Sequence, residues 1–223
     1  MLHLSEHKPF ATGNHRAVYV HPHSKGRCVK VHHAHTPSAL KRNLLPWYRR
    51  FRRSYHFDEN LAELRQINKI QDRAGVTCLC LPSVEGIVET DLGPGLIVEL
   101  ITDANGRISR TAGEHVKLFG YTTEVESTLH NLRNSMIQHN IQIKDPGTRN
   151  IVFQKREDQT LRAVIIDGLG TPTILPIDRL SPKLSIMRID AKISKIVRRL
   201  RKAGSQSPSS QIKRSNLPKT GSS

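Results

Sequence analysis

The sequence predicts an α+β fold in two lobes: an antiparallel sheet with one helix, then a reduced, mainly helical second lobe. Two observations support this prediction. Four short runs rich in β-branched residues, bounded by Gly/Pro turns, fall within residues 1–101 around one helical pattern. Between residues 102 and 203, two stretches with helical spacing flank a pair of short apolar runs. We expect these ranges to form the two lobes, and residues 204–223 to be a disordered basic tail.

The first lobe begins with a predicted hairpin. The runs "AVYV" (17–20) and "RCVKV" (27–31) are joined by the turn "HPHSKG". Two further strands are predicted at 83–90 and 95–101, separated by "DLGPG". Between the two pairs, the segment 57–70 has apolar residues on one helical face. Those residues are Leu61, Leu64, Ile67 and Ile70.

The second lobe contains two predicted helices and one predicted hairpin. The segment 122–141 begins with a Thr cap and acidic residues, as helices commonly do. The strands "NIVFQ" and "RAVIIDG" follow around the turn "KREDQT". A last helix is predicted over 184–200, with basic residues between the apolar positions Ile186, Ile189, Ile193, Ile196, Val197 and Leu200.

The chain is strongly basic, with a formal net charge of +16, and the charge is unevenly distributed. Residues 181–223 carry eleven Lys/Arg and one acid, and a second basic cluster lies at 41–53. Such patches indicate an anionic partner, namely phosphate, nucleic acid or an acidic membrane surface. A charged face that only increases solubility is the alternative.

The basic segments allow a packing role and a binding role. The segment 41–53 belongs to an amphipathic pattern that predicts either an accessory helix on the first lobe or a surface for acidic lipid or RNA. The helical segment 183–202 is expected to pack on the small second lobe, with its charged face free to attract an anionic membrane or substrate.

Compartment and metal signals are weak. No apolar run approaches the roughly 20 residues of a membrane span, and the N-terminus lacks the apolar core of a signal peptide. With an odd number of cysteines, this predicts a cytoplasmic protein, with a peripheral position at the inner membrane face as an option.

"CLC" at 78–80 is interpreted as core, and "LPKTG" at 217–221 as a chance match to a sortase signal. Five histidines between residues 21 and 35 lack matching acids or cysteines, so a metal site is the weaker interpretation and a role for His21 in the turn the stronger.

The first lobe contains candidate residues for binding phosphates. Gly13 lies in a turn where backbone N–H groups could approach a phosphate, although an ordinary turn glycine is the commoner case. Lys30 lies in an apolar strand, where a buried ammonium needs an anion or an acid. Glu63 on the following helix could supply that carboxylate, with Glu59 as the second choice and a solvated helix face as the alternative for both.

The second lobe contains candidate residues for catalysis and for a metal. Asp145 and Asn150 lie five apart in "DPGTRN", and Asp167 ends an apolar strand 17 residues later. These could be ordinary turn residues. However, two oxygen ligands from Asn150 and Asp167 suit Mg²⁺, which binds few protein ligands together with water and phosphate oxygens.

The order of these features is that of the protein-kinase-like fold: glycine turn, strand lysine, helix glutamate, two strands, helix, D-x-x-x-x-N, hairpin and Asp-Gly. Two motifs are more specific: R-x-x-Y-x-H-P at residues 16–22 and V-E-T-x-x-G-x-G at residues 88–95. Through these motifs, and over about residues 4–180, the chain resembles the bacterial YrbL family of PhoP regulatory network proteins. Members of that family are assigned to the kinase-like superfamily.

The resemblance implies a set of roles. Lys30 would bind ATP phosphates and pair with Glu63, Asp145 would be the catalytic base, and Asn150 and Asp167 would bind Mg²⁺. The adenine would lie against "VELI" (98–101), which includes Glu99.

The sequence also departs from the kinase pattern. The residues before Asp145 are Ile and Lys instead of His and Arg, Gly147 replaces a common Lys, and Gly168 replaces the usual Phe. No A-P-E segment follows, which argues against a full platform for protein substrates.

We therefore carry two functional hypotheses. The first is an ATP/Mg²⁺-dependent phosphotransferase whose acceptor hydroxyl belongs to a protein, a sugar or a lipid. The second is a pseudokinase-like module that engages an anionic partner through its basic surfaces. A nucleic-acid binder ranks last, because no known RNA- or DNA-binding signature accompanies the charge.

Overall fold

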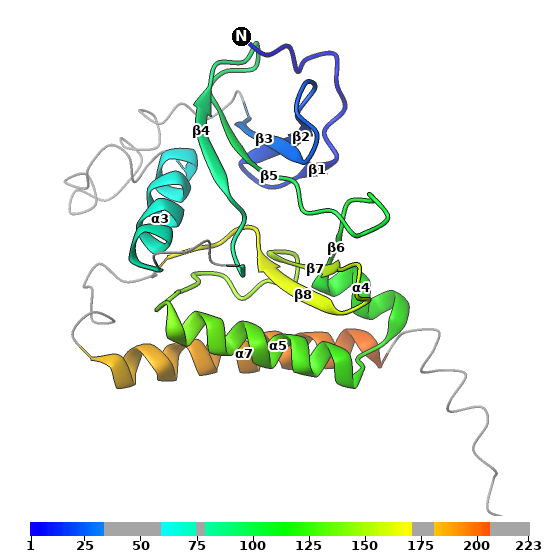
Figure 1. The fold of residues 1–223 in the computed structure, drawn as a ribbon, viewed down its shortest axis with the longest axis vertical. Helices are drawn as coiled ribbons and strands as arrows, with labels where there is room; N and C mark the ends of the chain where they lie inside the picture. Colours follow the sequence, from blue (N-terminus) through cyan, green and yellow to red (C-terminus); the bar gives the residue numbers. More distant parts are fainter. Residues whose placement is uncertain (34–58, 75–78, 171–180, 206–223) are drawn as a thin grey trace, which may run out of the picture. The chain divides into compact units, whose positions relative to one another are not determined.

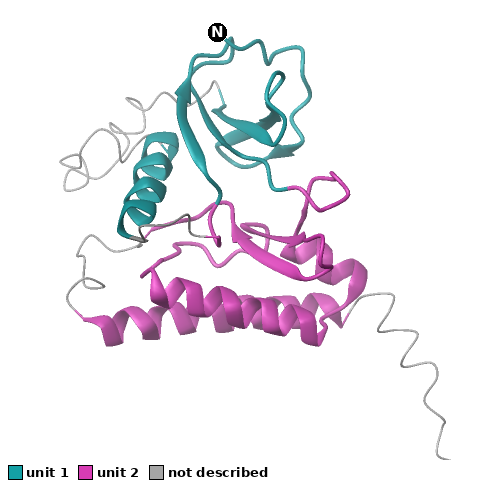
Figure 2. Cartoon of the chain, in the orientation of Figure 1, with its two compact units in different colours: residues 1–77, 82–101 teal, residues 78–81, 102–223 magenta. Residues whose placement is uncertain are grey.

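The computed structural model describes residues 1–33, 59–74, 79–170 and 181–205 of the 223-residue chain. The chain divides into two units (Figure 2). Unit 1 comprises residues 1–77 and 82–101, and unit 2 comprises residues 78–81 and 102–223.

Unit 1 is built on a five-stranded antiparallel sheet with the order β1-β2-β3-β5-β4 (Figure 1). The first three strands are β1 (Ala11–Thr12), β2 (Arg16–Val20) and β3 (Arg27–His32). Helix α3 (Glu59–Ala74) precedes β4 (Val84–Val88) and β5 (Gly95–Glu99). In the register of the central strands, Val18 of β2 lies opposite Lys30 of β3, and Lys30 lies opposite Leu96 of β5.

The alternation of side chains along β2 and β3 gives the sheet two buried faces. One face holds a cluster formed by Leu4, Ala17, Tyr19, Val29 and Val31. The opposite face holds Cys28, Leu96 and Val98, against which Leu64 of α3 packs. Lys30 alternates with Val29 and Val31, so its side chain projects on the same face as Cys28 and towards α3.

Within its described residues, unit 2 combines a three-stranded antiparallel sheet with the helices α4, α5 and α7 (Figure 1). The strands are β6 (Arg110–Thr111), β7 (Ile151–Lys155) and β8 (Leu161–Ile165), in the order β6-β7-β8. The helices are α4 (Ala112–Phe119), α5 (Thr123–Gln138) and α7 (Pro182–Gly204). Cys80 also belongs to this unit, because its carbonyl accepts a hydrogen bond from the Ile165 amide at 2.9 Å.

Helix α7 completes the core of unit 2. Its residues Ile189, Ile193, Ile196 and Leu200 are at most 7% exposed. The Arg133 guanidinium of α5 donates hydrogen bonds to both carboxylate oxygens of Asp190, at 2.6 and 3.1 Å. Packing of the predicted stripe on the second lobe is confirmed for these four residues, whereas Ile186, predicted in the same stripe, is 37% exposed.

The predicted α+β class, with an antiparallel N-terminal sheet and a mainly helical second part, is confirmed. The sequence reading missed the two-residue strands β1 and β6 and the helix α4. Thr111 and Glu114 form a capping box at the start of α4, and this was the available signal. The prediction of core at 78–80 is confirmed for the buried Cys80 and wrong for Leu79, which is 57% exposed. The predictions for 41–53, for Cys78 and for 206–223 lie outside the described residues.

Candidate functional site

Lys30 and Glu63 form the predicted ion pair inside unit 1. The Nζ atom of Lys30 lies 2.5 Å from Oε1 of Glu63, and both side chains are less than a tenth exposed. The sequence brings them together because β3 turns Lys30 towards α3 and Glu63 lies on the side of α3 that is buried against the sheet. A buried pair of this kind is stable only while both partners remain.

A second buried cation, which sequence reasoning did not identify as a site residue, shares the same carboxylate. The Nη1 atom of Arg16 donates to Oε2 of Glu63 at 2.6 Å and to Oδ1 of Asn60 at 3.1 Å. The amide nitrogen of Asn60 in turn donates to the Lys30 carbonyl at 3.0 Å. Each carboxylate oxygen of Glu63 thus has its own cation, which fixes the rotamer of this side chain. Arg16 opens the R-x-x-Y-x-H-P motif, which was the available signal.

Two cations around one buried carboxylate leave an excess of positive charge. Glu59, the predicted second choice for Lys30, lies instead 3.7 Å from Nε of Arg16 and is 40% exposed. It compensates Arg16 from the edge of the network. Nearby, Cys28 is buried on the same face of the sheet, and this burial raises the pKa of its thiol to about 11. Cys28 therefore remains a neutral thiol beside the pair.

Gly13 and Glu99, the other two residues predicted to bind the nucleotide, have hydrogen-bond partners within unit 1. The Gly13 amide donates to the Arg16 carbonyl at 2.8 Å, and its own carbonyl accepts from Nε2 of His33 at 3.0 Å. The carboxylate of Glu99 accepts from the Ser83 amide at 2.9 Å. In this conformation Gly13 closes a turn, and Glu99 ties β5 to the start of β4.

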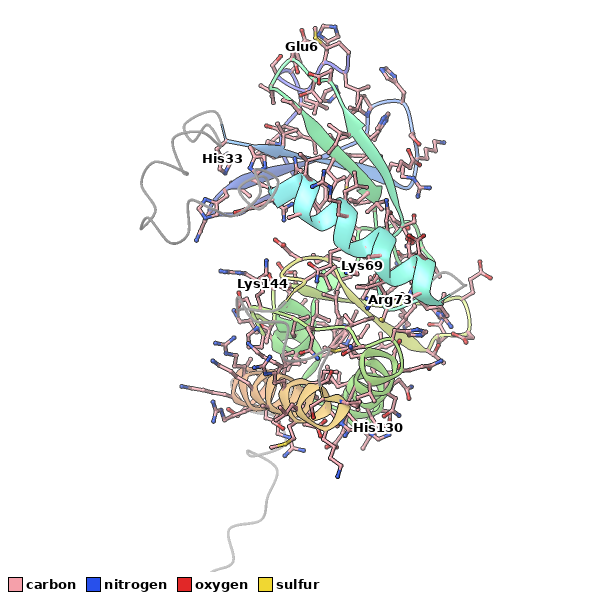
Figure 3. All side chains as sticks on the ribbon, turned by 90° about the vertical axis from the view of Figure 1, so that its left-hand side faces the viewer. Glu6, His33, Lys69, Arg73, His130 and Lys144 are labelled. Carbon is pink, nitrogen blue, oxygen red and sulfur yellow. The ribbon has the colours of Figure 1, made fainter. Side chains whose placement is uncertain are left out.

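The loop that carries Asp145 is organised by Asn150 within unit 2. Nδ2 of Asn150 donates to Oδ2 of Asp145 at 3.2 Å and to its carbonyl at 3.3 Å. The Asp145 side chain is 47% exposed, so its carboxylate is open to a ligand. Lys144, its neighbour in the chain, is exposed at the surface of unit 2 (Figure 3).

The loop also brings Asp167 close to Asn150. The Ile166 amide donates to the Asn150 carbonyl at 2.9 Å, and the Gly168 carbonyl accepts from the Lys144 amide at 2.7 Å. Gly168 has a φ of 78°, and a Cβ atom there would lie 3.1 Å from Nδ2 of Asn150. A glycine after Asp167 therefore permits both the left-handed backbone and the close approach of Asn150.

Helix α7 supports this loop with two basic side chains. Nζ of Lys192 donates to the Lys144 carbonyl at 2.7 Å, and Nη1 of Arg199 donates to the Pro146 carbonyl at 2.7 Å. These two carbonyls flank Asp145 in the chain. Partial burial lowers the pKa of Lys192, and the positive charge of Lys195 lowers it further. The negative charge of Asp145 acts in the opposite direction. The basic residues of α7 are thus partly committed to the loop and not simply a solvated face.

The structure assembles the predicted residues in two sets. Lys30 and Glu63 meet in unit 1, and Asp145, Asn150 and Asp167 gather in unit 2. Across the ranges that the structure describes, no group of three or more His, Cys, Asp or Glu is arranged to hold a metal. Of the clustered histidines, His21 accepts a hydrogen bond from the His23 amide at 3.1 Å, within its own turn.

None of the helices in the described segments has both the length and the apolar character that a bilayer crossing requires. The longest of them, α7, alternates its apolar stripe with basic residues.

Among solved structures, this chain is similar to WbdD. It matches a 2.2 Å crystal structure (TM-score 0.36, 14% identity), a co-crystal structure with the kinase inhibitor LY294002 (0.39, 14%) and a structure described as a bifunctional kinase-methyltransferase (0.34, 13%). The matches cover 79–82% of this chain but only 34–44% of those chains. Scores below 0.5 at this identity support no conclusion about activity.

Sequence comparison gives the clearer relationship. The chain is 26% identical over 180 residues to the "Uncharacterized protein YrbL" of Escherichia coli (strain K12), which covers 79% of this chain and 77% of that protein. The Shigella flexneri protein of the same name matches equally. The family model described as "PhoP regulatory network protein YrbL" matches residues 2–201. The chain therefore belongs to the YrbL family.

Proposed function

We propose that this protein is an ATP- and Mg²⁺-dependent phosphotransferase that acts on a hydroxyl group of a protein, sugar or lipid. The observation that carries the proposal is the buried Lys30–Glu63 pair. A lysine ammonium costs free energy to bury, and a phosphate-binding lysine oriented by a helix glutamate is a recurring part of kinase sites. The order of the remaining parts, from Asp145 through Asn150 to Asp167, supports the same chemistry.

The residues of unit 2 fit a magnesium ion by their chemistry. Asn150 offers an amide oxygen and Asp167 a carboxylate, and Mg²⁺ prefers oxygen ligands with few contributed by protein. When bound with nucleotide, the ion would neutralise charge on the phosphate oxygens.

In the proposed reaction the acceptor oxygen forms a bond to the γ-phosphorus. The bond from that phosphorus to the β–γ bridging oxygen breaks, and ADP leaves. Asp145, with its exposed carboxylate, would orient the acceptor hydroxyl and take its proton. Lys30 would bind the nucleotide phosphates, in an orientation fixed by Glu63 and Arg16. Positioning and charge stabilisation would provide most of the rate enhancement.

The test is phosphate transfer or ATP hydrolysis by the full chain with Mg²⁺ and γ-labelled ATP. We expect Asp145→Asn to reduce turnover by at least about 100-fold. Asp158→Asn is the matched control, because Asp158 is exposed in the turn between β7 and β8 and bonds Thr160 there. Turnover that both variants retain, or that both lose, would contradict the proposal.

A pseudokinase-like module is the second candidate. The observation that favours it is the Gly13 turn, whose amide is already paired with the Arg16 carbonyl. Such a module would bind nucleotide without transferring phosphate. Stabilisation of the wild type by ATP in a thermal melt, with no turnover above the Asp145→Asn level, would favour this second function.

A further inference from the structure

Basic side chains gather around Asp145 in unit 2 beyond those that the proposed reaction uses. Nη2 of Arg149 lies 3.7 Å from Oδ2 of Asp145. Lys192 donates to the neighbouring Lys144 carbonyl, and Lys195 follows on the same side of α7. Figure 3 shows the nitrogen-tipped side chains that project from α7.

Lys192 is held in a fixed position that faces the Asp145 loop. Its ammonium has three N–H donors. One donates to the Lys144 carbonyl at 2.7 Å, and two can donate to a ligand. Burial and the like charge of Lys195 both disfavour its ammonium, as its lowered pKa indicates. An anion bound nearby would favour the charged form of Lys192, so its ammonium would be more stable with the ligand than without it.

Arg199, which also contacts this loop from α7, already donates to the Pro146 carbonyl at 2.7 Å. Arg149, in contrast, is 75% exposed and only loosely paired with Asp145 at 3.7 Å. Arg149 and Lys192, which approach the proposed base, and Lys195, which lies near Lys192, therefore supply positive charge that is open to a ligand.

In the proposed reaction, Lys30 would bind the nucleotide phosphates, and Asn150 and Asp167 would hold Mg²⁺. Arg149, Lys192 and Lys195 have no part in that set. A group bound to them would belong to the acceptor, because Asp145 orients the acceptor hydroxyl. This step rests on the proposed function.

We propose that Arg149, Lys192 and Lys195 form an anion site for the acceptor, and that the acceptor is an alcohol that already carries a phosphate group. A phosphate offers three acceptor oxygens, which suit an ammonium and a guanidinium that approach from different elements. The phosphate belongs either to a small soluble molecule or to a lipid headgroup, which have this chemistry in common.

The test measures binding to the full chain saturated with Mg²⁺ and a non-hydrolysable imido analogue of ATP, so that the nucleotide site is filled. The soluble probes are glycerol 3-phosphate and glucose 6-phosphate, each compared by calorimetry with neutral glycerol or glucose. The lipid probe is sedimentation with phosphatidylglycerol vesicles, compared with phosphatidylcholine. We expect the phosphate-bearing member of at least one pair to bind, and Lys192→Gln to weaken that binding about tenfold.

Variants separate a site from general charge. Lys183→Gln is the matched control, because Lys183 is exposed on the same helix nine residues earlier, about two and a half turns away on the opposite side. We expect it to change affinity less than twofold, and Lys192→Arg to restore binding. Arg149→Gln, at an exposed position, gives a second reading that does not depend on the folding of α7.

The probes that bind decide whether the anion site exists and where its phosphate comes from. Binding to soluble probes or to vesicles alone supports the site and identifies its source of phosphate. Equal binding of charged and neutral probes, equal loss in Lys183→Gln and Lys192→Gln, or tight binding of a single-stranded oligonucleotide alone overturns it. Turnover of labelled ATP is scored separately, so an anion site without turnover would refute the phosphotransferase and leave the site standing.

Discussion

The two sets of candidate residues differ in how the fold holds them. In unit 1, Lys30, Glu63 and Arg16 are each about 8% exposed and hold one another through side-chain charges. In unit 2, the Asp145 side chain is 47% exposed, and its loop is held through backbone carbonyls that accept from Lys192 and Arg199. The first set is therefore a network closed to solvent, and the second is a solvent-exposed loop that helix α7 supports.

This difference separates two tasks. A closed network keeps the lysine oriented before any ligand arrives, which reduces reorganisation on binding. An open carboxylate keeps its hydrogen-bonding capacity for a ligand, at little cost in stability. Mutations in the first set should therefore unfold the protein, whereas mutations at Asp145 should affect function. The predictions below test that contrast, ordered by the expected loss of stability.

The largest loss is expected at Glu63. Glu63→Ala leaves Arg16 and Lys30 buried together without their carboxylate, and we expect the free energy of unfolding to fall by about 3–5 kcal/mol. Lys30→Met should cost less, because it leaves one cation for one acid. Urea denaturation followed by circular dichroism measures both.

The matched control is Glu85→Ala, which removes the carboxylate of the more exposed Arg27–Glu85 pair in the same unit. It should cost at most about 1 kcal/mol. Similar losses for Glu63→Ala and Glu85→Ala would mean that the Glu63 network is not closed to solvent.

The next loss is expected in the apolar support of the Asp145 loop. Ile196 of α7 is 0% exposed, so Ile196→Ala should lower the free energy of unfolding by about 2–4 kcal/mol through lost burial and a cavity. Because α7 holds the loop, hydrogen exchange of the amides of residues 143–145 and 147 should accelerate in the same variant. Ile186→Ala, at a 37% exposed position of the same helix, should change both quantities little. Unchanged exchange in Ile196→Ala would contradict the support role.

A smaller loss is expected at Gly168. Alanine there meets a φ of 78° and places its Cβ 3.1 Å from Nδ2 of Asn150. Gly106 has nearly the same φ, 77°, but nothing within 4 Å of a Cβ. We expect Gly106→Ala to lower the free energy of unfolding by about 1 kcal/mol through backbone strain alone, and Gly168→Ala to lower it by about 2 kcal/mol. Thermal melts give the difference, and calorimetry with ATP and Mg²⁺ should show weaker binding only for Gly168→Ala.

The sequence predicted those parts of the fold that follow from local patterns. Alternation around Lys30 and helical spacing around Glu63 were sufficient to predict their pairing, because a buried ammonium needs an acid and the strand–helix order supplies one. The β7–β8 hairpin and the apolar stripe of α7 follow from the same periodicities.

The missing parts depend on side chains that reach across the fold. Arg16 was read only as a motif residue, because nothing in its strand indicates that it would share Glu63. Lys192 and Arg199 were interpreted as surface charge, since a helix pattern shows which residues lie beside the apolar stripe but not which carbonyls they meet. Gly13 was expected in a turn whose backbone N–H groups could approach a phosphate, and the pattern did not show that its own amide would pair with the Arg16 carbonyl.

The smallest effect is expected at Asp91, a surface carboxylate that is held more tightly than Asp145. It accepts from the Ser5 hydroxyl at 2.6 Å and from the Leu4 amide at 2.7 Å, so it anchors the N-terminal segment whose Leu4 is buried. These hydrogen bonds lower the pKa of Asp91 from 3.8 to about 2, and the bond from the Ser5 hydroxyl has the largest effect. Because the folded pKa is the lower one, ionised Asp91 stabilises the fold above about pH 4, and this stabilisation is lost as the pH falls through about 2. The melting temperature of Asp91→Asn should thus lie slightly below that of the wild type at pH 6, and the gap should close towards pH 2.5. An NMR titration of the Asp91 carboxyl with a midpoint near 3.8, or a gap that does not change with pH, would show that these hydrogen bonds do not anchor the N-terminal segment.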